Sequence, residues 1–227
     1  MTLLPFTPHD IHAVIFDMDG LLLDSERVAL ATVAEAAAEL GVPWRYEVGL
    51  ALVGLNSKDG PAVIRKHLGE DYPTAALYDT FGRLYEVAIA EGRIPLKGGV
   101  IALFDVLDTL GLGRVVATST RRSRAEPKLA AVGLLPRVHG IVCGDEVSRG
   151  KPAPDIFLAA AAKLGVAVEN CLVLEDSNAG VRGALAAGTR VVMVPDLLQP
   201  ADDLRAAQVP VAASLHDIAG FLATRCA

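Results

Sequence analysis

The sequence predicts an α/β protein, in which a parallel sheet is flanked by helices and an all-helical segment is inserted after the first strand. Short apolar runs alternate with helical patterns along most of the chain, as is typical of strands that are buried on both faces of a parallel sheet. The alternation is interrupted once, between the first apolar run at residues 13–16 and the second at residues 114–118. An insertion behind the first strand explains the long interval.

Four helical patterns separate the apolar runs of the predicted sheet. The predicted strands are residues 13–16, 114–118, 140–143, 171–175 and 190–194, and the predicted helices are residues 99–110, 122–132, 155–164 and 178–187. A glycine follows each of these helices, as expected of residues that end a helix in the left-handed conformation. Repeated strand–helix–strand units imply right-handed crossovers and therefore a parallel sheet.

The inserted segment is predicted to be all helix. Helices are expected at residues 26–40, 46–52, 57–68 and 74–92, and the aromatic residues among them supply a core for a small bundle. We therefore expect a discontinuous α/β core made of residues 1–22 and 96–227, and a helical cap domain made of residues 23–95.

Composition narrows the classes of function. The 227 residues are 52% hydrophobic and 21% charged with a formal net charge of −6, which indicates a folded chain and no basic nucleic-acid surface. Arg121, Arg122 and Arg124 are close together, but they open a predicted helix and fit a solvated face. The three cysteines have no disulfide or zinc spacing, and we find neither a signal peptide nor a membrane span. We expect a cytoplasmic protein that binds neither nucleic acid nor membranes. The sequence does not fix the oligomeric state, and we favour a monomer.

Polar residues stand where the predicted strands end. Asp17 and Asp19 follow the first strand, and their spacing lets both side chains face one side, while Gly20 allows the chain to turn. The next three strands are followed by Thr118 and Ser119, by Lys151, and by the adjacent acids Glu175 and Asp176. A turn or a helix cap would explain each group alone. Ligands of open α/β sheets bind at the carboxyl ends of the strands, so the four groups together indicate a site.

The motifs DMDGLLLDSE, VVATST, GKPAPDIF and LEDSNAGVRGALAAG resemble those of the haloacid dehalogenase superfamily, in its branch of helical-cap phosphatases and phosphomutases. The resemblance covers nearly the whole chain and implies a Rossmann-like core. It also implies that Asp17 is the nucleophile that forms an aspartyl-phosphate and that Asp19 is the acid/base. The remaining implied roles are phosphoryl binding by Thr118, Lys151, Ser119 and Gly20, and Mg²⁺ binding by Asp17, the Asp19 carbonyl, Asp176 and, directly or through water, Glu175.

Electrostatics supports these roles. Four carboxylates would repel a phosphate dianion, and a divalent cation with oxygen ligands, together with Lys151, would remove most of that repulsion. The second aspartate of the first motif argues against dehalogenation, because chloride leaves without a proton whereas an alkoxide needs one.

The sequence departs at two positions from the pattern of the phosphomutases, and both departures favour a hydrolase. β-Phosphoglucomutase-like members carry a cap-hinge histidine where this chain has Ala29, and an arginine in a G-x-S-R motif where GLNSKDG places Ser57. We predict a Mg²⁺-dependent phosphatase that acts on a small phosphorylated metabolite, such as a sugar phosphate. A phosphomutase and a non-catalytic binding module remain alternatives. Asn56, Ser57 and Lys58 are candidates for contacting the substrate, and a helix N-cap is the competing interpretation of the first two.

Overall fold

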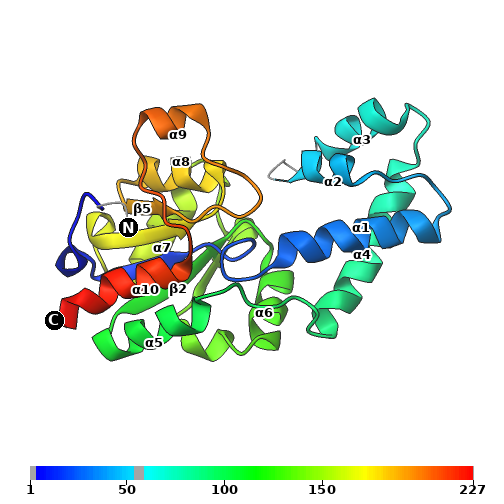
Figure 1. Ribbon diagram of the computed structural model, residues 1–227. Coiled ribbons are helices and arrows are strands. Elements are labelled where there is room, and N and C mark those ends of the chain that lie inside the picture. Colours follow the sequence, from blue (N-terminus) through cyan, green and yellow to red (C-terminus); the bar gives the residue numbers. More distant parts are fainter. Residues whose placement is uncertain (1–3, 54–58, 227) are drawn as a thin grey trace. The chain divides into compact units, whose positions relative to one another are not determined.

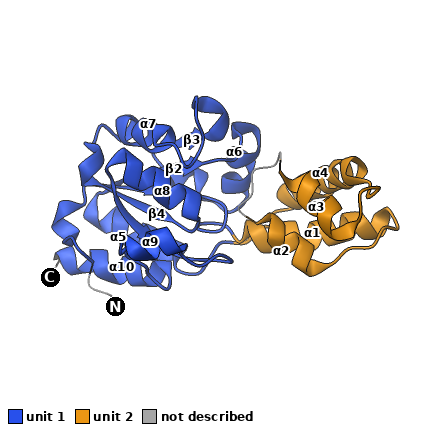
Figure 2. Cartoon of the chain, turned by 90° about the horizontal axis from the view of Figure 1, so that it is seen from above, with its two compact units in different colours: residues 1–23, 96–227 blue, residues 24–95 orange. Residues whose placement is uncertain are grey.

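A computed structural model describes residues 4–53 and 59–226 of the chain (Figure 1). The chain forms two compact units (Figure 2). The first unit contains residues Met1–Leu23 and Leu96–Ala227, and the second contains residues Asp24–Pro95. The chain therefore leaves the first unit after its first strand and returns to it once.

The first unit contains a five-stranded parallel sheet in the order β3-β2-β1-β4-β5. The strands are β1 (Ala13–Phe16), β2 (Gly113–Thr118), β3 (Ile141–Cys143), β4 (Cys171–Glu175) and β5 (Arg190–Met193). Strand β1 is central, and all four of its residues are buried. Its Ile15 pairs with Val115 of β2 on one side and with Val173 of β4 on the other, so the carboxyl ends of the three strands lie at the same side of the sheet.

Helices cover both faces of this sheet. The α-helices of the unit are α5 (Val100–Leu110), α6 (Arg122–Ala131), α7 (Asp155–Leu164), α8 (Asn178–Ala187), α9 (Asp202–Ala206) and α10 (Leu215–Ala223). Phe157 of α7 and Val181 of α8 pack with Ile15 in one core cluster. On the opposite face, the Phe16 ring lies 5.2 Å from the Phe104 ring of α5, and α5 also packs against α10. The short 3₁₀ helices are η1 (Pro8–Asp10), η2 (Leu135–Arg137), η3 (Gly144–Glu146), η4 (Val168–Asn170) and η5 (Thr224–Cys226).

The second unit is all helix in its described part. It contains α1 (Ser25–Glu39), α2 (Tyr46–Leu52), α3 (Gly60–Leu68) and α4 (Thr74–Ala90). Val48, Ile64 and Leu77 form its core, with Tyr72 buried beside them and Trp44 packed against them. Tyr46 is 57% exposed, so the expectation that every aromatic residue of this segment fills its core is wrong at that position.

The predicted fold class is confirmed, and the predicted strands agree with the structure to within one residue at each end. The glycines predicted to end helices have positive φ, as at Gly165 after α7 (φ 66°). The C-terminal helices α9 and α10 were not predicted. Among the described residues, no helix combines the length and the apolar character needed to cross a membrane.

Candidate active site

The carboxyl ends of the central strands bring the predicted polar residues to one edge of the sheet. Asp17 follows β1, Thr118 ends β2 and Glu175 ends β4. The Asp17 backbone N–H donates to the Leu174 carbonyl at 3.0 Å, which extends the pairing between β1 and β4 by one residue. Parallel pairing in register therefore places the side chains of distant segments side by side.

Lys151 links the ends of three strands. Its ammonium donates to Asp17 Oδ1, to Glu175 Oε1 at 2.5 Å and to the Ala117 carbonyl of β2 at 3.0 Å. These contacts match the three donors that a lysine carries. The Lys151 side chain is 5% exposed, and its Nζ also lies 5.2 Å from the centre of the Phe157 ring, so the cation is buried.

Burial makes the charges at this edge interact strongly. Burial raises the pKa of Asp17 to about 7, with Glu175 and Asp19 adding to the increase, although the Lys151 ammonium acts in the opposite direction. For Lys151, burial alone lowers the pKa, but the Asp17 and Glu175 carboxylates outweigh it and raise the pKa above its usual value. The ammonium is therefore charged at neutral pH, while Asp17 needs further positive charge to be fully ionised.

Glu175 is fully buried and holds Lys151 in place. Its Oε1 accepts from Lys151, and its Oε2 accepts from the backbone N–H and the hydroxyl of Ser177, both at 2.9 Å. The Ser177 hydroxyl also accepts from the Gly180 N–H at 3.0 Å and caps α8. Both carboxylate oxygens of Glu175 thus contact protein donors, and its role as a metal ligand stays a prediction.

Asp19 has partners of its own, which come from the segment after β2. Its Oδ1 accepts from the Lys128 ammonium of α6 at 2.8 Å, and its Oδ2 accepts from the Thr120 hydroxyl at 2.6 Å. The Lys128 side chain is 4% exposed, whereas that of Asp19 is 22% exposed. Both oxygens of the predicted acid/base are therefore oriented by hydrogen bonds.

Lys128 is a site residue that the motifs did not reveal. It shares the buried face of α6 with Ala125 and Leu129, at the i+3 and i+4 spacing of one helix face. Lysine is almost never buried unless it is paired. A lysine on the apolar face of the predicted helix 122–132 is the signal that could have identified it.

The phosphate-binding candidates lie at the end of β2. Thr118 is 1% exposed, and its hydroxyl accepts from the Thr120 N–H at 3.1 Å, which closes the turn after the strand. Ser119 is exposed. A Cβ atom on Gly144 would lie 2.3 Å from the Ser119 carbonyl oxygen, so a glycine after β3 lets the two loops approach.

The surroundings of Gly20 fit a hard divalent cation. Gly20 has φ 86°, and a Cβ atom there would lie 2.2 Å from Oδ2 of Asp176. The glycine thus lets the Asp176 carboxylate lie against the loop that carries Asp17 and Asp19. Within residues 4–53 and 59–226, no group of three or more His, Cys, Asp or Glu side chains is placed to hold a metal. Carboxylates such as those of Asp17 and Asp176 are donors that suit Mg²⁺, with water and phosphate as further ligands, and the predicted ligand set stays a prediction.

The structure does not test the substrate-contacting residues that were predicted in the second unit. Asn56, Ser57 and Lys58 lie outside the described residues. Ala29, the position compared with the mutase histidine, is half-buried in α1.

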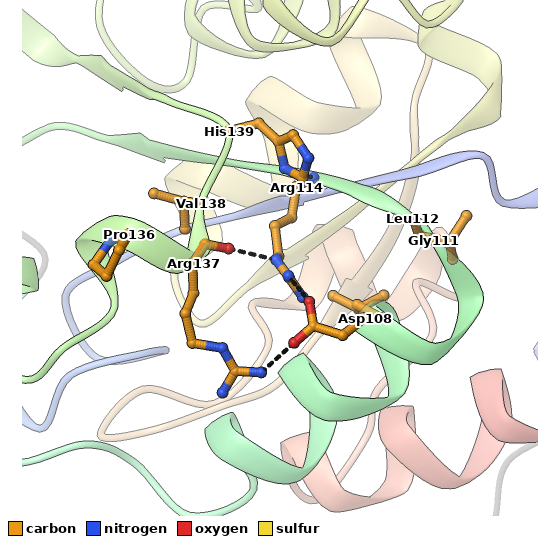
Figure 3. Close-up of a pocket in the computed structure, with 9 residues that line it drawn as sticks. Asp108, Gly111, Leu112, Arg114, Pro136, Arg137, Val138 and His139 are labelled. Atoms are coloured by element: carbon orange, nitrogen blue, oxygen red, sulfur yellow. Dashed lines mark hydrogen bonds and ion pairs between the residues drawn. The ribbon is translucent and has the colours of Figure 1, made fainter.

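A separate cavity lies by the amino end of β2, at the opposite end of that strand from Thr118. It has a volume of about 510 Å³ and is lined by Leu107, Asp108, Gly111, Leu112, Arg114, Pro136, Arg137, Val138 and His139 (Figure 3). Arg114 lies near the start of β2 and donates to the Arg137 carbonyl at 2.6 Å and to Asp108. None of the predicted site residues that the structure describes lines this cavity.

Comparison with known proteins identifies the family of this chain. The family model of the haloacid dehalogenase-like hydrolases matches residues 11–188, which contain every polar residue described at the carboxyl edge of the sheet. The chain belongs to the haloacid dehalogenase-like hydrolase family. This membership confirms the resemblance inferred from the four motifs.

Individual relatives cover nearly all of the chain. Protein CbbY of Rhodobacter capsulatus is 35% identical, over 87% of this chain and 91% of the relative. Hexitol phosphatase A of Escherichia coli is 33% identical, over 93% of each. The structure of a candidate β-phosphoglucomutase from Thermotoga maritima superposes with a TM-score of 0.80 at 26% identity, and the match covers 93% of this chain and 98% of that one.

Proposed function

We propose that this hydrolase is a Mg²⁺-dependent phosphomonoesterase that cleaves small phosphate esters through an aspartyl-phosphate at Asp17. One observation carries the proposal: the buried Lys151 ammonium joins Asp17 to Glu175 where β1 and β4 end, and the separately held Asp19 lies two residues from Asp17. A carboxylate nucleophile, a fixed cation and a second, oriented carboxyl group are the parts that two-step phosphoryl transfer needs.

In the first step, a carboxylate oxygen of Asp17 attacks phosphorus and the bond from phosphorus to the ester oxygen breaks. The ester oxygen takes a proton from the Asp19 carboxyl group and leaves as an alcohol. Lys151 places its positive charge beside Asp17, where negative charge builds up on the phosphoryl oxygens, and Glu175 holds the ammonium there. The products of this step are the alcohol, the Asp17 phosphate and an ionised Asp19.

In the second step, water attacks the phosphorus atom of the Asp17 phosphate. Asp19 accepts a proton from this water, the bond between phosphorus and Asp17 breaks, and inorganic phosphate is released. The Asp17 carboxylate and the protonated Asp19 are thereby regenerated. We assign phosphoryl binding to the Thr118 hydroxyl and to the Ser119 backbone N–H.

A divalent cation fits beside the same loop. Asp17, Asp176 and the Asp19 carbonyl are the groups that we propose to hold Mg²⁺. When it is bound, Mg²⁺ neutralises negative charge on the phosphoryl group and on Asp17. The raised pKa of Asp17 supports the need for such a charge, because a nucleophilic carboxylate must be ionised.

Hydrolysis is favoured over phosphoryl transfer between two positions of a sugar. A mutase has to retain a bisphosphate intermediate while the sugar reorients in the site. This needs a second cationic side chain, which binds the phosphate group that is not being transferred. Ala29 offers no such group, and Ser57 stands where the mutase motif has arginine. We propose a sugar phosphate or a similar polar metabolite as the substrate class, with support from the relative named as a hexitol phosphatase.

The proposed setting is a reducing compartment, since Cys143 and Cys171 are buried free thiols. Burial raises the pKa of Cys143 to about 11, so this thiol is unreactive at neutral pH. One chain supplies all the groups of the proposed site, which fits a monomer.

Release of inorganic phosphate from a panel of sugar, polyol and nucleoside monophosphates tests the proposal. Wild-type protein with Mg²⁺ is expected to hydrolyse at least one class, and EDTA is expected to stop it. The matched control is Asp17→Asn, which keeps the shape of the side chain and removes the nucleophile. Full activity of that variant, or glucose 6-phosphate from β-glucose 1-phosphate without free phosphate, would contradict the proposal.

A further inference from the structure

We propose that Lys128 is a positioning residue for the acid/base Asp19, which it holds by one oxygen so that the other faces the reacting ester. The inference rests on the proposed function, because it assigns Asp19 the proton transfer. It starts from the contact between Lys128 Nζ and Asp19 Oδ1 at 2.8 Å, which joins residues 109 positions apart in the chain.

The chemistry of the two donors distinguishes the two oxygens of Asp19. The lysine ammonium can only donate, so the oxygen that faces Lys128 has to act as an acceptor. The Thr120 hydroxyl, 2.6 Å from Oδ2, can either donate or accept. Oδ2 can therefore carry a proton without losing its contact, whereas Oδ1 cannot. This assigns Oδ2 as the oxygen that exchanges the proton with the ester oxygen and with water.

Stability does not account for a lysine at this place. Its side chain is 4% exposed on the face of α6 that also buries Ala125 and Leu129. Replacing a buried ion pair by well-packed apolar residues is often neutral or stabilising. A leucine or methionine would suit this face of the helix, so the cation is better explained by what it does to Asp19.

The two lysines of the site have separate tasks. Lys151 contacts Asp17 and Glu175, and Lys128 contacts Asp19. Loss of Lys151 should therefore weaken stabilisation of the phosphoryl group with every substrate. Loss of Lys128 should lower kcat/KM only where the leaving oxygen needs a proton, because the water attack that Asp19 also assists follows release of the alcohol and affects kcat with every ester.

The test compares Lys128→Met on two kinds of ester. Alkyl phosphates such as sugar or polyol phosphates release an alkoxide that needs a proton, whereas p-nitrophenyl phosphate releases a phenolate that is stable without one. We expect kcat/KM to fall about 10- to 100-fold for the alkyl ester and less than about threefold for the aryl ester. Lys128→Arg, which retains the charge, is expected to restore part of the loss. Lys163→Met, which removes an exposed lysine from the last turn of α7, is the matched control and should change neither value.

Several outcomes would overturn the inference. Equal losses on both esters, with a lower melting temperature, would make Lys128 a structural residue. A weaker inhibition by inorganic phosphate in Lys128→Met would make it a phosphate-binding residue. A further loss of alkyl-ester activity when Lys128→Met is added to Asp19→Asn would show that it acts independently of Asp19. An Asp17→Asn variant that stays active on both esters would instead refute the proposed function.

Discussion

Two charged clusters of the first unit, one at the carboxyl ends and one at the amino ends of the strands, differ in burial and in the balance of their charges. The carboxyl-edge cluster consists of Asp17, Asp19, Lys128, Lys151 and Glu175, and the amino-edge cluster consists of Asp105, Asp108, Arg114 and Arg137. Lys151 and its two carboxylate partners have side chains that are 5%, 9% and 0% exposed. In the amino-edge cluster, the Asp108 and Asp105 side chains are 50% and 63% exposed.

The balance of charge also differs. In the carboxyl-edge cluster, three carboxylates face two ammonium groups, and the neighbouring Asp176 adds a fourth carboxylate. In the amino-edge cluster, the guanidiniums of Arg114 and Arg137 face the exposed carboxylates of Asp108 and Asp105. Figure 3 shows the two arginines around Asp108. Arg114 lowers the pKa of Asp108, with Arg137 contributing, whereas burial raises that of Asp17. A buried excess of negative charge is destabilising by itself. In the proposed function, the same carboxylates hold the cation and attack the phosphoryl group.

The largest effect is expected from Lys151→Met. Removal of this ammonium should lower kcat by at least about 100- to 1,000-fold. It leaves Asp17 and Glu175 buried without their shared cation, so stability should fall by about 3–5 kcal/mol at neutral pH. Urea denaturation and phosphate release measure the two losses. Lys151→Met with Glu175→Gln should regain stability but not activity, and a recovery of activity would argue against the role of the cation.

Asp17→Asn should remove activity and yet raise the stability of the folded protein above neutral pH. The pKa of Asp17 is about 7 in the folded protein, above its ordinary value of 3.8, so the folded state binds the proton more tightly. Its contribution to stability is present below about pH 4 and is lost as the pH rises through about 7. Without Mg²⁺, the wild type should therefore lose stability over this range relative to Asp17→Asn, which should be the more stable at pH 8. Thermal melts from pH 4 to pH 8 in EDTA measure the difference, and parallel curves would contradict this assignment.

Arg114→Met tests the amino-edge cluster. Arg114 donates to the carbonyls of Phe104 and Arg137 at 2.8 and 2.6 Å, and its guanidinium stacks over the Phe104 ring. Loss of these hydrogen bonds should cost about 1–3 kcal/mol. The variant should retain full kcat and KM, because no group of the proposed site touches Arg114. A loss of activity in correctly folded protein would show that the two edges are coupled.

The smallest effect is expected from Asp108→Asn. The pKa of Asp108 is lowered mainly by Arg114, so its contribution to stability is present above its ordinary pKa of 3.8 and is lost as the pH falls below that value. The variant should therefore differ from the wild type only slightly, and only above about pH 4. Melting temperatures at pH 3 and pH 7 measure this, and a larger difference at pH 3 would have the wrong sign.

The parallel sheet could be predicted from the sequence because its strands contain continuous apolar runs, as in β1 and β4, where every residue is buried. The C-terminal helix α10 was missed, although Ser214 and Asp217 form a capping box at its start. The motifs led to Asp17, Lys151 and Glu175, which meet. They did not reveal the partnership of Asp19 with Lys128, because a contact across 109 residues depends on how α6 is placed on the sheet.

Mapping of the phosphorylated residue tests the central claim most directly. Asp19→Asn with p-nitrophenyl phosphate and Mg²⁺ should complete the first step, which needs no acid, and should stall before water attack. Acid quenching and trypsin then yield the peptide of residues 1–27, which ends at Arg27, the first lysine or arginine of the chain. Fragmentation is expected to place one phosphoryl group on Asp17. A phosphoryl group on any other residue, or an unmodified peptide during steady release of p-nitrophenol, would contradict the account.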